Sequence, residues 1–278
     1  MRLAVLSDIH GNLTALNVVL NDLAANGPFD VTWCLGDLAA FGPRPLECVD
    51  VIRRLAETDE GKTFKVIGGN TDRYLIGGER LRVGAAQDEA ELKRLAGELQ
   101  TRDTMLNWSM GALDWENYKF LRTILRRELA TNVPGYGVVL GFHAVPGDDE
   151  AFLTDSTPDE LVADIMLDRE GRLGIGGHTH RQLNRLAGGW HIVNPGAWDY
   201  PSTAPALRST RSCRSRTARY RSICAISPTT STRWWKMRVM SVIRTRTGSQ
   251  ANYGPTVNPC HVHSSFLTIF PATHTLAY

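Results

Sequence analysis

The sequence has few of the features that mark several common protein classes. Its five cysteines are odd in number, widely spaced and form no C-x-x-C pair, so they give no sign of a zinc or redox motif and are expected to be reduced. The uncharged run between Arg2 and Asp8 covers only residues 3–7, which is far short of a secretion signal or a membrane span. We therefore predict a cytoplasmic protein with no membrane partner.

Acidic residues are missing from the last part of the chain. All 29 Asp and Glu lie in residues 1–199, whereas residues 200–278 contain 11 of the 31 Lys and Arg. Residues 202–278 therefore form an atypical basic C-terminal segment in which hydrophobic periodicity is lost. One interpretation is a nucleic-acid-binding arm with interleaved aromatics such as Trp234 and Trp235. We favour the other, a disordered or out-of-frame segment, and do not expect nucleic acid as a partner.

The remaining chain is rich in alternating strand and helix patterns. With 278 residues and 42% hydrophobic content, the protein is long enough to bury a core. Strands are expected at 2–7, 31–37, 63–70, 136–144, 173–180 and 190–196, and helices at 13–27, 45–57 and 157–167, the last with a capping box from Thr157 to Glu160. Residues from about 87 to 130 predict a helical insertion within a domain spanning 1–201. This alternation favours an α/β fold with a parallel or mixed sheet.

Polar side chains follow the ends of the predicted strands. Asp8 and His10 are two residues apart, so in extended chain both would leave on one side. The others of this kind are Asp37, Asn70, His143, His178 and His180. Because the carboxyl ends of parallel strands line one crevice, these groups are expected to converge there.

The number and chemistry of these donors predict a metal centre. Seven oxygen and nitrogen donors exceed what one tetrahedral zinc ion needs. They suit two adjacent divalent ions bridged by one carboxylate. Mixed imidazole and carboxylate ligation favours manganese, iron, zinc or nickel over magnesium or calcium.

These motifs together resemble a known family. "DIHGN" at 8–12, "GD" at 36–37, "GN" at 69–70, an isolated His143 and "GHTH" at 177–180 resemble the five blocks of the calcineurin-like metallophosphoesterase superfamily. "LGDLAAFGPRP", the helices near Trp108 and Trp115, and "HIVNPGAW" are similar to its small phosphodiesterases of the YfcE and MJ0936 type and its diadenosine tetraphosphatase-related branch. The resemblance covers residues 1 to about 201.

The resemblance implies a fold and a role for each ligand. The fold would be a four-layer αββα sandwich of two mixed sheets flanked by helices. Asp8, His10 and His180 would bind one metal, and Asn70, His143 and His178 the other. Asp37 would bridge the two, which are expected to be manganese first, with iron, zinc or nickel as alternatives.

The resemblance also implies an activity. The protein would be a metal-dependent hydrolase that cleaves phosphodiesters or nucleoside polyphosphate anhydrides by a metal-bridging hydroxide, with Asp37, Asn70 and His143 as catalytic residues. Thr71 stands where many relatives have a histidine that protonates the leaving group, which favours substrates with good leaving groups. Asp72 is a candidate acceptor for the ligand histidines.

Further residues are candidates for substrate binding, and two other functions are alternatives. Thr71, Arg44, Arg73 and Arg181 are candidates for binding the phosphate of a small-molecule phosphoester or nucleotide. The aromatics Trp108, Trp115 and Tyr118 predict either a cap over a nucleobase or, as we favour, part of the core. The alternatives to catalysis on small molecules are a non-catalytic scaffold that keeps the fold, and a nucleic-acid phosphodiesterase that uses the basic tail. The oligomeric state stays open.

Overall fold

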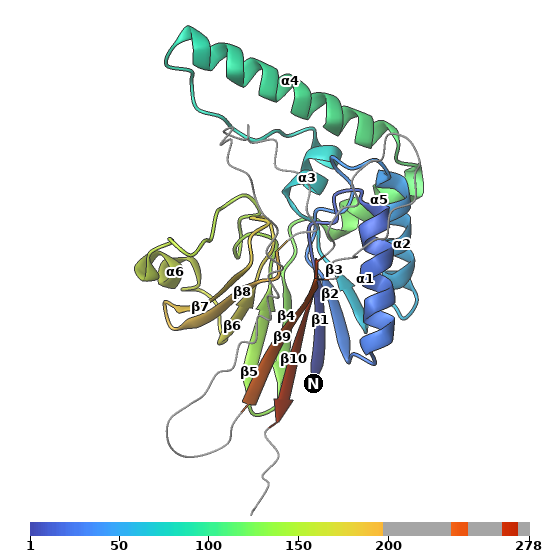
Figure 1. Cartoon of the computed structure of the whole chain (residues 1–278), viewed down its shortest axis with the longest axis vertical. Helices are drawn as coiled ribbons and strands as arrows, with labels where there is room; N and C mark the ends of the chain where they lie inside the picture. Colours follow the sequence, from blue (N-terminus) through green and yellow to red (C-terminus); the bar gives the residue numbers. More distant parts are fainter. Residues whose placement is uncertain (197–234, 244–262, 272–278) are drawn as a thin grey trace, which may run out of the picture.

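Figure 1 presents the computed structural model, which describes residues 1–196, 235–243 and 263–271. Within these residues the chain forms two five-stranded sheets and six helices. Sheet A has the strand order β3-β2-β1-β10-β9, and sheet B has the order β4-β5-β6-β8-β7. Both sheets are mixed, because each combines parallel and antiparallel neighbours.

Each sheet contains three short apolar strands that run parallel to one another. In sheet A these strands are β1 (Arg2–Leu6), β2 (Val31–Cys34) and β3 (Phe64–Val66). In sheet B they are β5 (Gly137–Gly141), β6 (Leu173–Ile175) and β8 (Trp190–Asn194). The antiparallel strands β4 (Leu129–Val133) and β7 (Leu183–Ala187) close the edges of sheet B. Neither edge strand was expected from the sequence.

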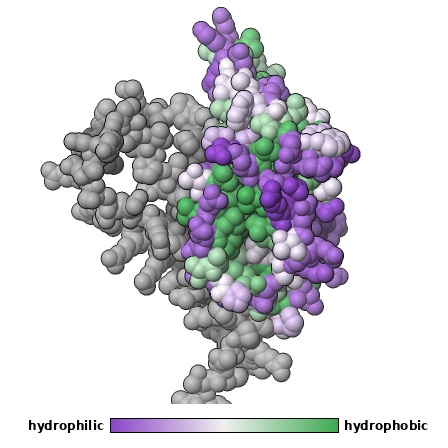
Figure 2. All heavy atoms as spheres, turned by 90° about the vertical axis from the view of Figure 1, so that its right-hand side faces the viewer, coloured by the Kyte–Doolittle hydropathy of each residue, from purple (hydrophilic) through white to green (hydrophobic). Residues whose placement is uncertain are grey.

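Helices cover the outer faces of both sheets. α1 (Leu13–Asn26), α2 (Pro45–Glu57), α3 (Asn70–Gly77) and α5 (Trp115–Ile124) lie on the side of sheet A, and α6 (Asp159–Ile165) lies on the side of sheet B (Figure 1). The long α4 (Glu89–Gly111) extends away from the sheets at the top of the view. On the face that carries the sheet A helices, hydrophobic residues form a strip bordered by hydrophilic ones (Figure 2).

Three buried clusters hold these layers together. One joins sheet A to its helices, with Leu6, Leu16 and Ile52 among its members. Another lies between the sheets, where Trp33 of sheet A packs near Val139 of sheet B. The third joins sheet B to α6. This order of helices, sheet, sheet and helix confirms the predicted four-layer αββα sandwich.

The C-terminal segment contributes two long strands to sheet A. β9 (Trp235–Ile243) and β10 (His263–Pro271) pair antiparallel with one another, and β10 pairs antiparallel with β1. Loss of hydrophobic periodicity gave no sign of these strands. The rest of the predicted segment 202–278 lies outside the described residues, and the domain boundary at 201 stays a prediction.

The structure also tests the predictions made for the helical insertion, for the start of α6 and for membrane-spanning helices. α4 and α5 fall within the predicted helical insertion, but Trp108 and Trp115 are 54% and 61% exposed, so the preferred core assignment for these two rings was wrong. The capping box of α6 was also wrong, because Pro158 occupies the N-cap position without a side-chain hydrogen bond. In the part of the chain that the structure describes, every helix is too short or too polar to cross a bilayer.

Candidate metal centre

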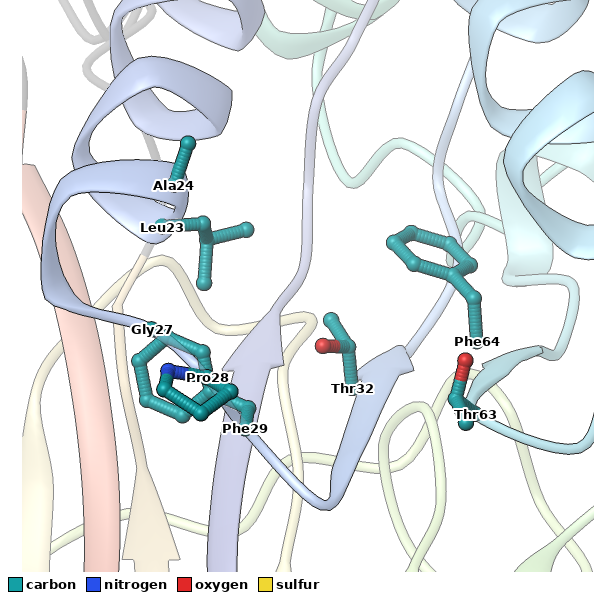
Figure 3. A pocket seen from close by; sticks show the side chains of 8 residues that line it. All are labelled: Leu23, Ala24, Gly27, Pro28, Phe29, Thr32, Thr63 and Phe64. Atoms are coloured by element: carbon teal, nitrogen blue, oxygen red, sulfur yellow. The ribbon is translucent and has the colours of Figure 1, made fainter.

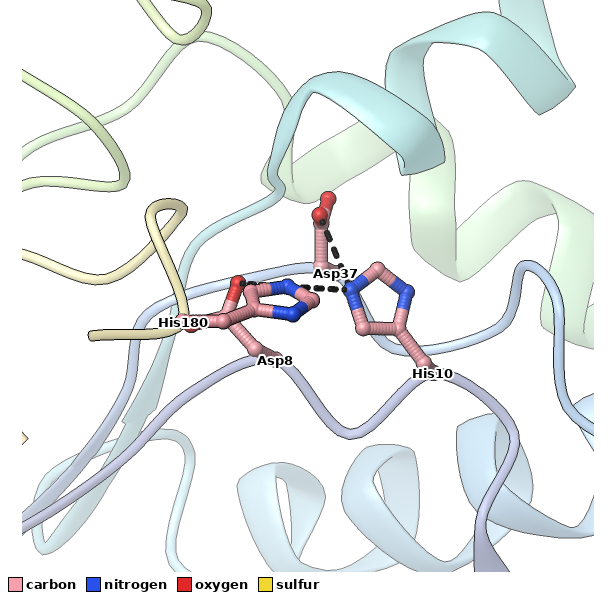
Figure 4. Close-up of side chains that lie close together, drawn as sticks. All are labelled: Asp8, His10, Asp37 and His180. Atoms are coloured by element: carbon pink, nitrogen blue, oxygen red, sulfur yellow. Dashed lines mark hydrogen bonds and ion pairs between the residues drawn. The ribbon is translucent and has the colours of Figure 1, made fainter. Parts of the chain in front are cut away.

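Six of the seven predicted metal ligands gather into two adjacent groups that share one aspartate. In the first, donor atoms of Asp8, His10, Asp37 and His180 all lie within 4.8 Å of one another (Figure 4), and the same limit holds for Asp37, His143 and His178 in the second. The seventh, Asn70, adds its Oδ1 to the second group. This oxygen lies 3.1 Å from His143 Nε2 and 3.2 Å from His178 Nδ1.

The topology explains why residues so far apart in the sequence meet. Asp8 and His10 follow β1, Asp37 follows β2, and Asn70 follows β3 as the first residue of α3. His143 follows β5, and the segment containing His178 and His180 follows β6. These five strands run parallel within their own sheets, so the carboxyl ends of both sheets supply the site.

The backbone is strained at five of the seven candidate ligands. Asp8, His10 and Asp37 have φ angles of 57°, 48° and 55°, and His178 and His180 have 65° and 57°. The extended conformation expected for Asp8 and His10 was therefore wrong. Positive φ is uncommon for residues other than glycine, and such strain persists where the surrounding structure enforces it, often at functional sites.

Two glycines permit the close approach of chain segments. A Cβ atom at Gly69 would collide with Asp37 Oδ1 and lie 2.6 Å from His143 Cε1. A Cβ atom at Gly177 would collide with Ser7 Oγ and lie 2.6 Å from Asp8 Oδ2. The second glycine of "GGN" and of "GGHTH" is thus needed because a carboxylate occupies the space of a side chain.

Asp37 connects the two groups through one of its two oxygens. Its Oδ2 lies 3.5 Å from His10 Nε2 and 3.5 Å from His143 Nε2. Its Oδ1 accepts hydrogen bonds from the backbone N–H of Thr71 at 3.0 Å and from Thr71 Oγ1 at 2.8 Å. Thr71 therefore orients the carboxylate so that Oδ2 faces histidines of both groups.

Backbone carbonyls orient three of the histidines. His10 Nδ1 lies 3.2 Å from the Ala40 oxygen, and His143 Nδ1 lies 2.7 Å from the Leu35 oxygen. His178 Nε2 lies 3.1 Å from the Glu150 oxygen. When these nitrogens donate to the carbonyls, the other nitrogen of each neutral ring carries a lone pair that faces the centre.

The predicted role of Asp72 as a partner of the histidines was wrong. Asp72 is fully buried and accepts hydrogen bonds from the backbone N–H groups of Leu38 and Gly69, at 3.0 and 3.1 Å. Burial and the neighbouring Asp37 charge raise the pKa of Asp72 to about 7. Asp72 thus fixes the loops that carry Asp37 and Asn70.

The inward-facing atoms fit divalent cations. His10 Nε2 and His180 Nε2 lie 2.9 Å apart, and in the second group the Asn70 oxygen faces two ring nitrogens. With its Nε2 donating to the Glu150 oxygen and its ring neutral, His178 opposes the Nδ1 lone pair to the Asn70 oxygen, an arrangement that a cation would satisfy. Oxygen and imidazole donors of this kind suit manganese, iron, zinc or nickel.

Electrostatics agree with a site built for positive charge. Burial disfavours ionisation of Asp37, but the neighbouring histidines outweigh this and hold its pKa below the ordinary value. Burial alone would lower the pKa of His143, whereas the Asp37 carboxylate raises it to about 10. Burial lowers the pKa of His10 and of His178. The carboxylates thus attract positive charge at a place where two of the histidines favour their neutral, ligating form.

Three of the four predicted phosphate-binding side chains already have partners within the protein. Thr71 is buried against Asp37. Arg73 is 12% exposed and forms ion pairs with Glu79, Asp149 and Glu150. Arg44 pairs with Glu47, and Arg181 is exposed. Their binding of phosphate stays a prediction.

Two supporting residues escaped the sequence interpretation. Asn194 is buried at the end of β8, and its Nδ2 donates to the Gly177 oxygen at 2.5 Å and to Thr179 Oγ1 at 3.1 Å. It thereby holds the loop that carries His178 and His180. The sequence signal was the quoted "HIVNPG", which contains an asparagine directly after an apolar strand. Glu150 gave no such signal, because its contribution to His178 is a backbone carbonyl.

A pocket lies at the other end of sheet A. It has a volume of about 580 Å³ and is lined by Leu23, Phe29, Thr32 and Phe64, among others (Figure 3). Thr32 and Phe64 lie near the amino ends of β2 and β3, away from the candidate ligands. None of the lining residues is ionisable, so acid, base or metal chemistry is favoured at the centre between the sheets instead.

The sequence belongs to a known class of protein. The model of the calcineurin-like phosphoesterase family matches residues 1–182, and the chain is a member of this family. The matched range contains all seven candidate ligands.

Individual relatives agree with this membership. The chain is 32% identical over 178 residues to protein MJ0912 of Methanocaldococcus jannaschii, a match that covers 64% of this chain and 62% of MJ0912. It is 37% identical over 71 residues to the symmetrical bis(5'-nucleosyl)-tetraphosphatase of Baumannia cicadellinicola, covering 26% of this chain and 23% of that enzyme. The chain thus spans less than two thirds of the length of these relatives. Protein PH1004 of Pyrococcus horikoshii shares the fold, with a TM-score of 0.53 and 21% identity over 70% of this chain and 76% of that one.

Proposed function

We propose that this protein is a dimetal-dependent phosphoesterase that hydrolyses phosphodiesters or nucleoside polyphosphate anhydrides. The observation that carries the proposal is the position of Asp37 Oδ2, 3.5 Å from His10 Nε2 in the first group and 3.5 Å from His143 Nε2 in the second. A single carboxylate shared in this way is the arrangement expected of a bridging ligand between two ions. Membership of the phosphoesterase family supports the same chemistry.

The chain's own residues would hold two divalent ions, manganese being our first expectation. Asp8, His10 and His180 would hold one, Asn70, His143 and His178 the other, and Asp37 both. When bound, such a pair lowers the pKa of a water molecule and neutralises phosphoryl oxygens during in-line displacement. The carbonyls of Ala40, Leu35 and Glu150 keep the imidazoles aimed inward, so little reorganisation accompanies binding.

The environment of Thr71 supports a preference for good leaving groups. Its hydroxyl donates to Asp37 and is buried, so Thr71 is not free to donate a proton to a departing alkoxide. General-acid assistance contributes about 10²- to 10⁴-fold in enzymes that have it. Phosphodiesters of acidic alcohols and phosphoanhydrides need this assistance least. The tetraphosphatase named above acts, by its name, on a substrate of the anhydride class.

Turnover and metal content of matched variants test the proposal. Hydrolysis of bis-p-nitrophenyl phosphate, p-nitrophenyl phosphate and diadenosine tetraphosphate is measured with added manganese. Asp37→Asn keeps the size of the side chain but removes the bridging charge, so activity should fall by more than the roughly 10- to 100-fold typical of losing an outer partner of a ligand. Bound manganese should fall from two ions per chain.

Asp103→Asn is the control for this variant. Asp103 is a partly exposed carboxylate on α4 that pairs with Arg80, and its removal should leave activity and metal content unchanged. Wild-type turnover in Asp37→Asn would contradict the bridging role. A wild-type protein that hydrolyses none of the substrates would favour a non-catalytic scaffold instead.

A further inference from the structure

A phenylalanine lies exposed at the edge of the second group. The ring centroid of Phe152 is 5.0 Å from that of His178, and the planes are inclined by 51°. Phe152 is 67% exposed. A single exposed apolar residue is ordinary on a protein surface, but this one contacts a candidate metal ligand.

The residues on either side of Phe152 point into the protein. Leu153 belongs to the buried cluster between sheet B and α6, and Ala151 packs against the same cluster. Phe152 is therefore held between two inward-facing neighbours with its own ring directed outward. The contact with His178 covers only part of this ring, and the remaining apolar surface is available to another molecule.

The preceding residues anchor this loop firmly. Arg73 of α3 forms a two-bond pair with Asp149, Nε to Oδ2 at 2.9 Å and Nη2 to Oδ1 at 2.8 Å. Its Nη2 also donates to Glu150 Oε1 at 2.6 Å, and Tyr74 donates to the same oxygen at 2.5 Å. Planar two-bond pairs of this kind fix geometry as well as charge. The ring of Phe152 thus projects from a preorganised loop.

Phe41 provides a contrast at the first group. Its ring lies 5.6 Å from that of His10, a contact similar to that between Phe152 and His178. However, Phe41 is partly buried and packs against the core between sheet A and its helices. Packing against the core explains why a phenylalanine occupies position 41. It does not explain why the Phe152 ring is exposed.

We propose that Phe152 is a stacking surface for a planar aromatic group carried by the substrate. The phosphate would lie at the candidate metal centre while the aromatic group lies on the Phe152 ring, so the substrate class is a phosphate ester or anhydride that bears a nucleobase or an aryl group. This inference rests on the proposed function, because it assumes that phosphate binds at the same centre. Stacking on aromatic side chains tolerates any base, because each base has a π face.

Equilibrium binding to the manganese-loaded full-length protein tests the inference in two arms. One arm compares AMP with ribose 5-phosphate, and the other compares phenyl phosphate with methyl phosphate. The wild type should bind the aromatic member of at least one pair more tightly. Phe152→Ala should weaken that member by about 5- to 140-fold, the range of base stacking on aromatic residues. It should leave the non-aromatic member and manganese affinity unchanged, and Phe152→Tyr should restore the preference.

The two arms identify the source of the aromatic group. A preference confined to AMP assigns a nucleobase, and one confined to phenyl phosphate assigns an aryl ester. Equal binding within both pairs, no binding of any of the four, or equal weakening of both members in Phe152→Ala would overturn the inference. A preference that is lost in Trp115→Ala and kept in Phe152→Ala would also overturn it, in favour of the helical insertion as the cap.

Turnover separates this result from the proposed function. A protein that shows the aromatic preference but hydrolyses no phosphoester would reject the proposed function and keep the stacking surface. An active hydrolase without the preference would reject the stacking surface alone.

Discussion

The two ligand groups of the candidate centre differ in how firmly their histidines are held. In the second group, His143 has a side chain that is only 2% exposed, and both His143 and His178 contact a backbone carbonyl through the outer nitrogen. In the first group, His10 Nδ1 lies 3.2 Å from the Ala40 oxygen, but the His180 side chain is 36% exposed, and its Nε2 lies near His10 Nε2 and Asp8 Oδ1. The second group is therefore more preorganised, although the two share Asp37.

This difference predicts unequal metal affinity. A ligand that is already oriented loses less conformational freedom on binding an ion, and its hydrogen-bonded outer nitrogen makes the inner one more basic. We expect the second group to bind manganese more tightly and the first group to release its ion first when a chelator is added. The protein would then pass through a state with one ion per chain.

The largest effect is expected from removing one histidine of each group. His143→Ala should weaken manganese binding at the second group by more than about 100-fold, the upper range for losing an outer partner. It should also weaken the first group, because Asp37 would lose a neighbour. His180→Ala should release only the ion of the first group. Metal content after dialysis and calorimetric titration with manganese measure both.

Thermal unfolding of the metal-free variants is the control for these two changes, since His143 is buried. Equal metal content in His143→Ala and His180→Ala, with both variants folded, would remove the distinction between the groups.

A smaller effect is expected at Thr71, which orients the carboxylate shared by both groups. Thr71→Val keeps the shape of the side chain and the backbone hydrogen bond to Asp37 Oδ1, but it removes the hydrogen bond from Oγ1. Manganese affinity should fall by about 10-fold at both groups, the lower range for an outer partner. Thr71→Ser keeps the hydroxyl and should bind manganese as the wild type does. If Thr71→Val and Thr71→Ser bind equally well, the hydroxyl does not position Asp37.

The sequence was sufficient to predict the layers of the fold. It was also sufficient to predict which polar residues lie close together. Apolar runs and helical spacing identified β1, β2, β3, β5, β6 and β8 together with the main helices. Because each candidate ligand follows a strand, the parallel arrangement was enough to bring them together. The family resemblance added the two facing sheets.

Local conformation at the centre was beyond the sequence. Asn70 starts α3 although it was expected at the end of the strand 63–70, and Asp8 and His10 have left-handed backbone where extended chain was expected. These conformations depend on contacts with distant segments, as when the N–H of Asp8 donates to the Gly36 oxygen. β9 and β10 showed no periodic pattern in the sequence. Local propensity alone is a weak guide to strands, because it depends on the neighbours against which a strand packs.

The smallest of these effects is expected at Arg73, which supports the second group from outside it. Arg73→Met keeps much of the aliphatic stem but removes the ion pairs with Asp149 and Glu150, so the loop whose Glu150 carbonyl orients His178 should loosen. Manganese affinity at the second group should fall less than about 10-fold, below the effect at Thr71, because every ligand remains. Arg169→Met is the matched control, since Arg169 forms a similar two-bond pair with Glu128 at 2.9 and 2.8 Å. If both variants lower thermal stability but only Arg73→Met lowers manganese affinity, the firmness of the second group comes from this loop. Equal affinities in the two variants would mean that the Glu150 carbonyl holds His178 without help from Arg73.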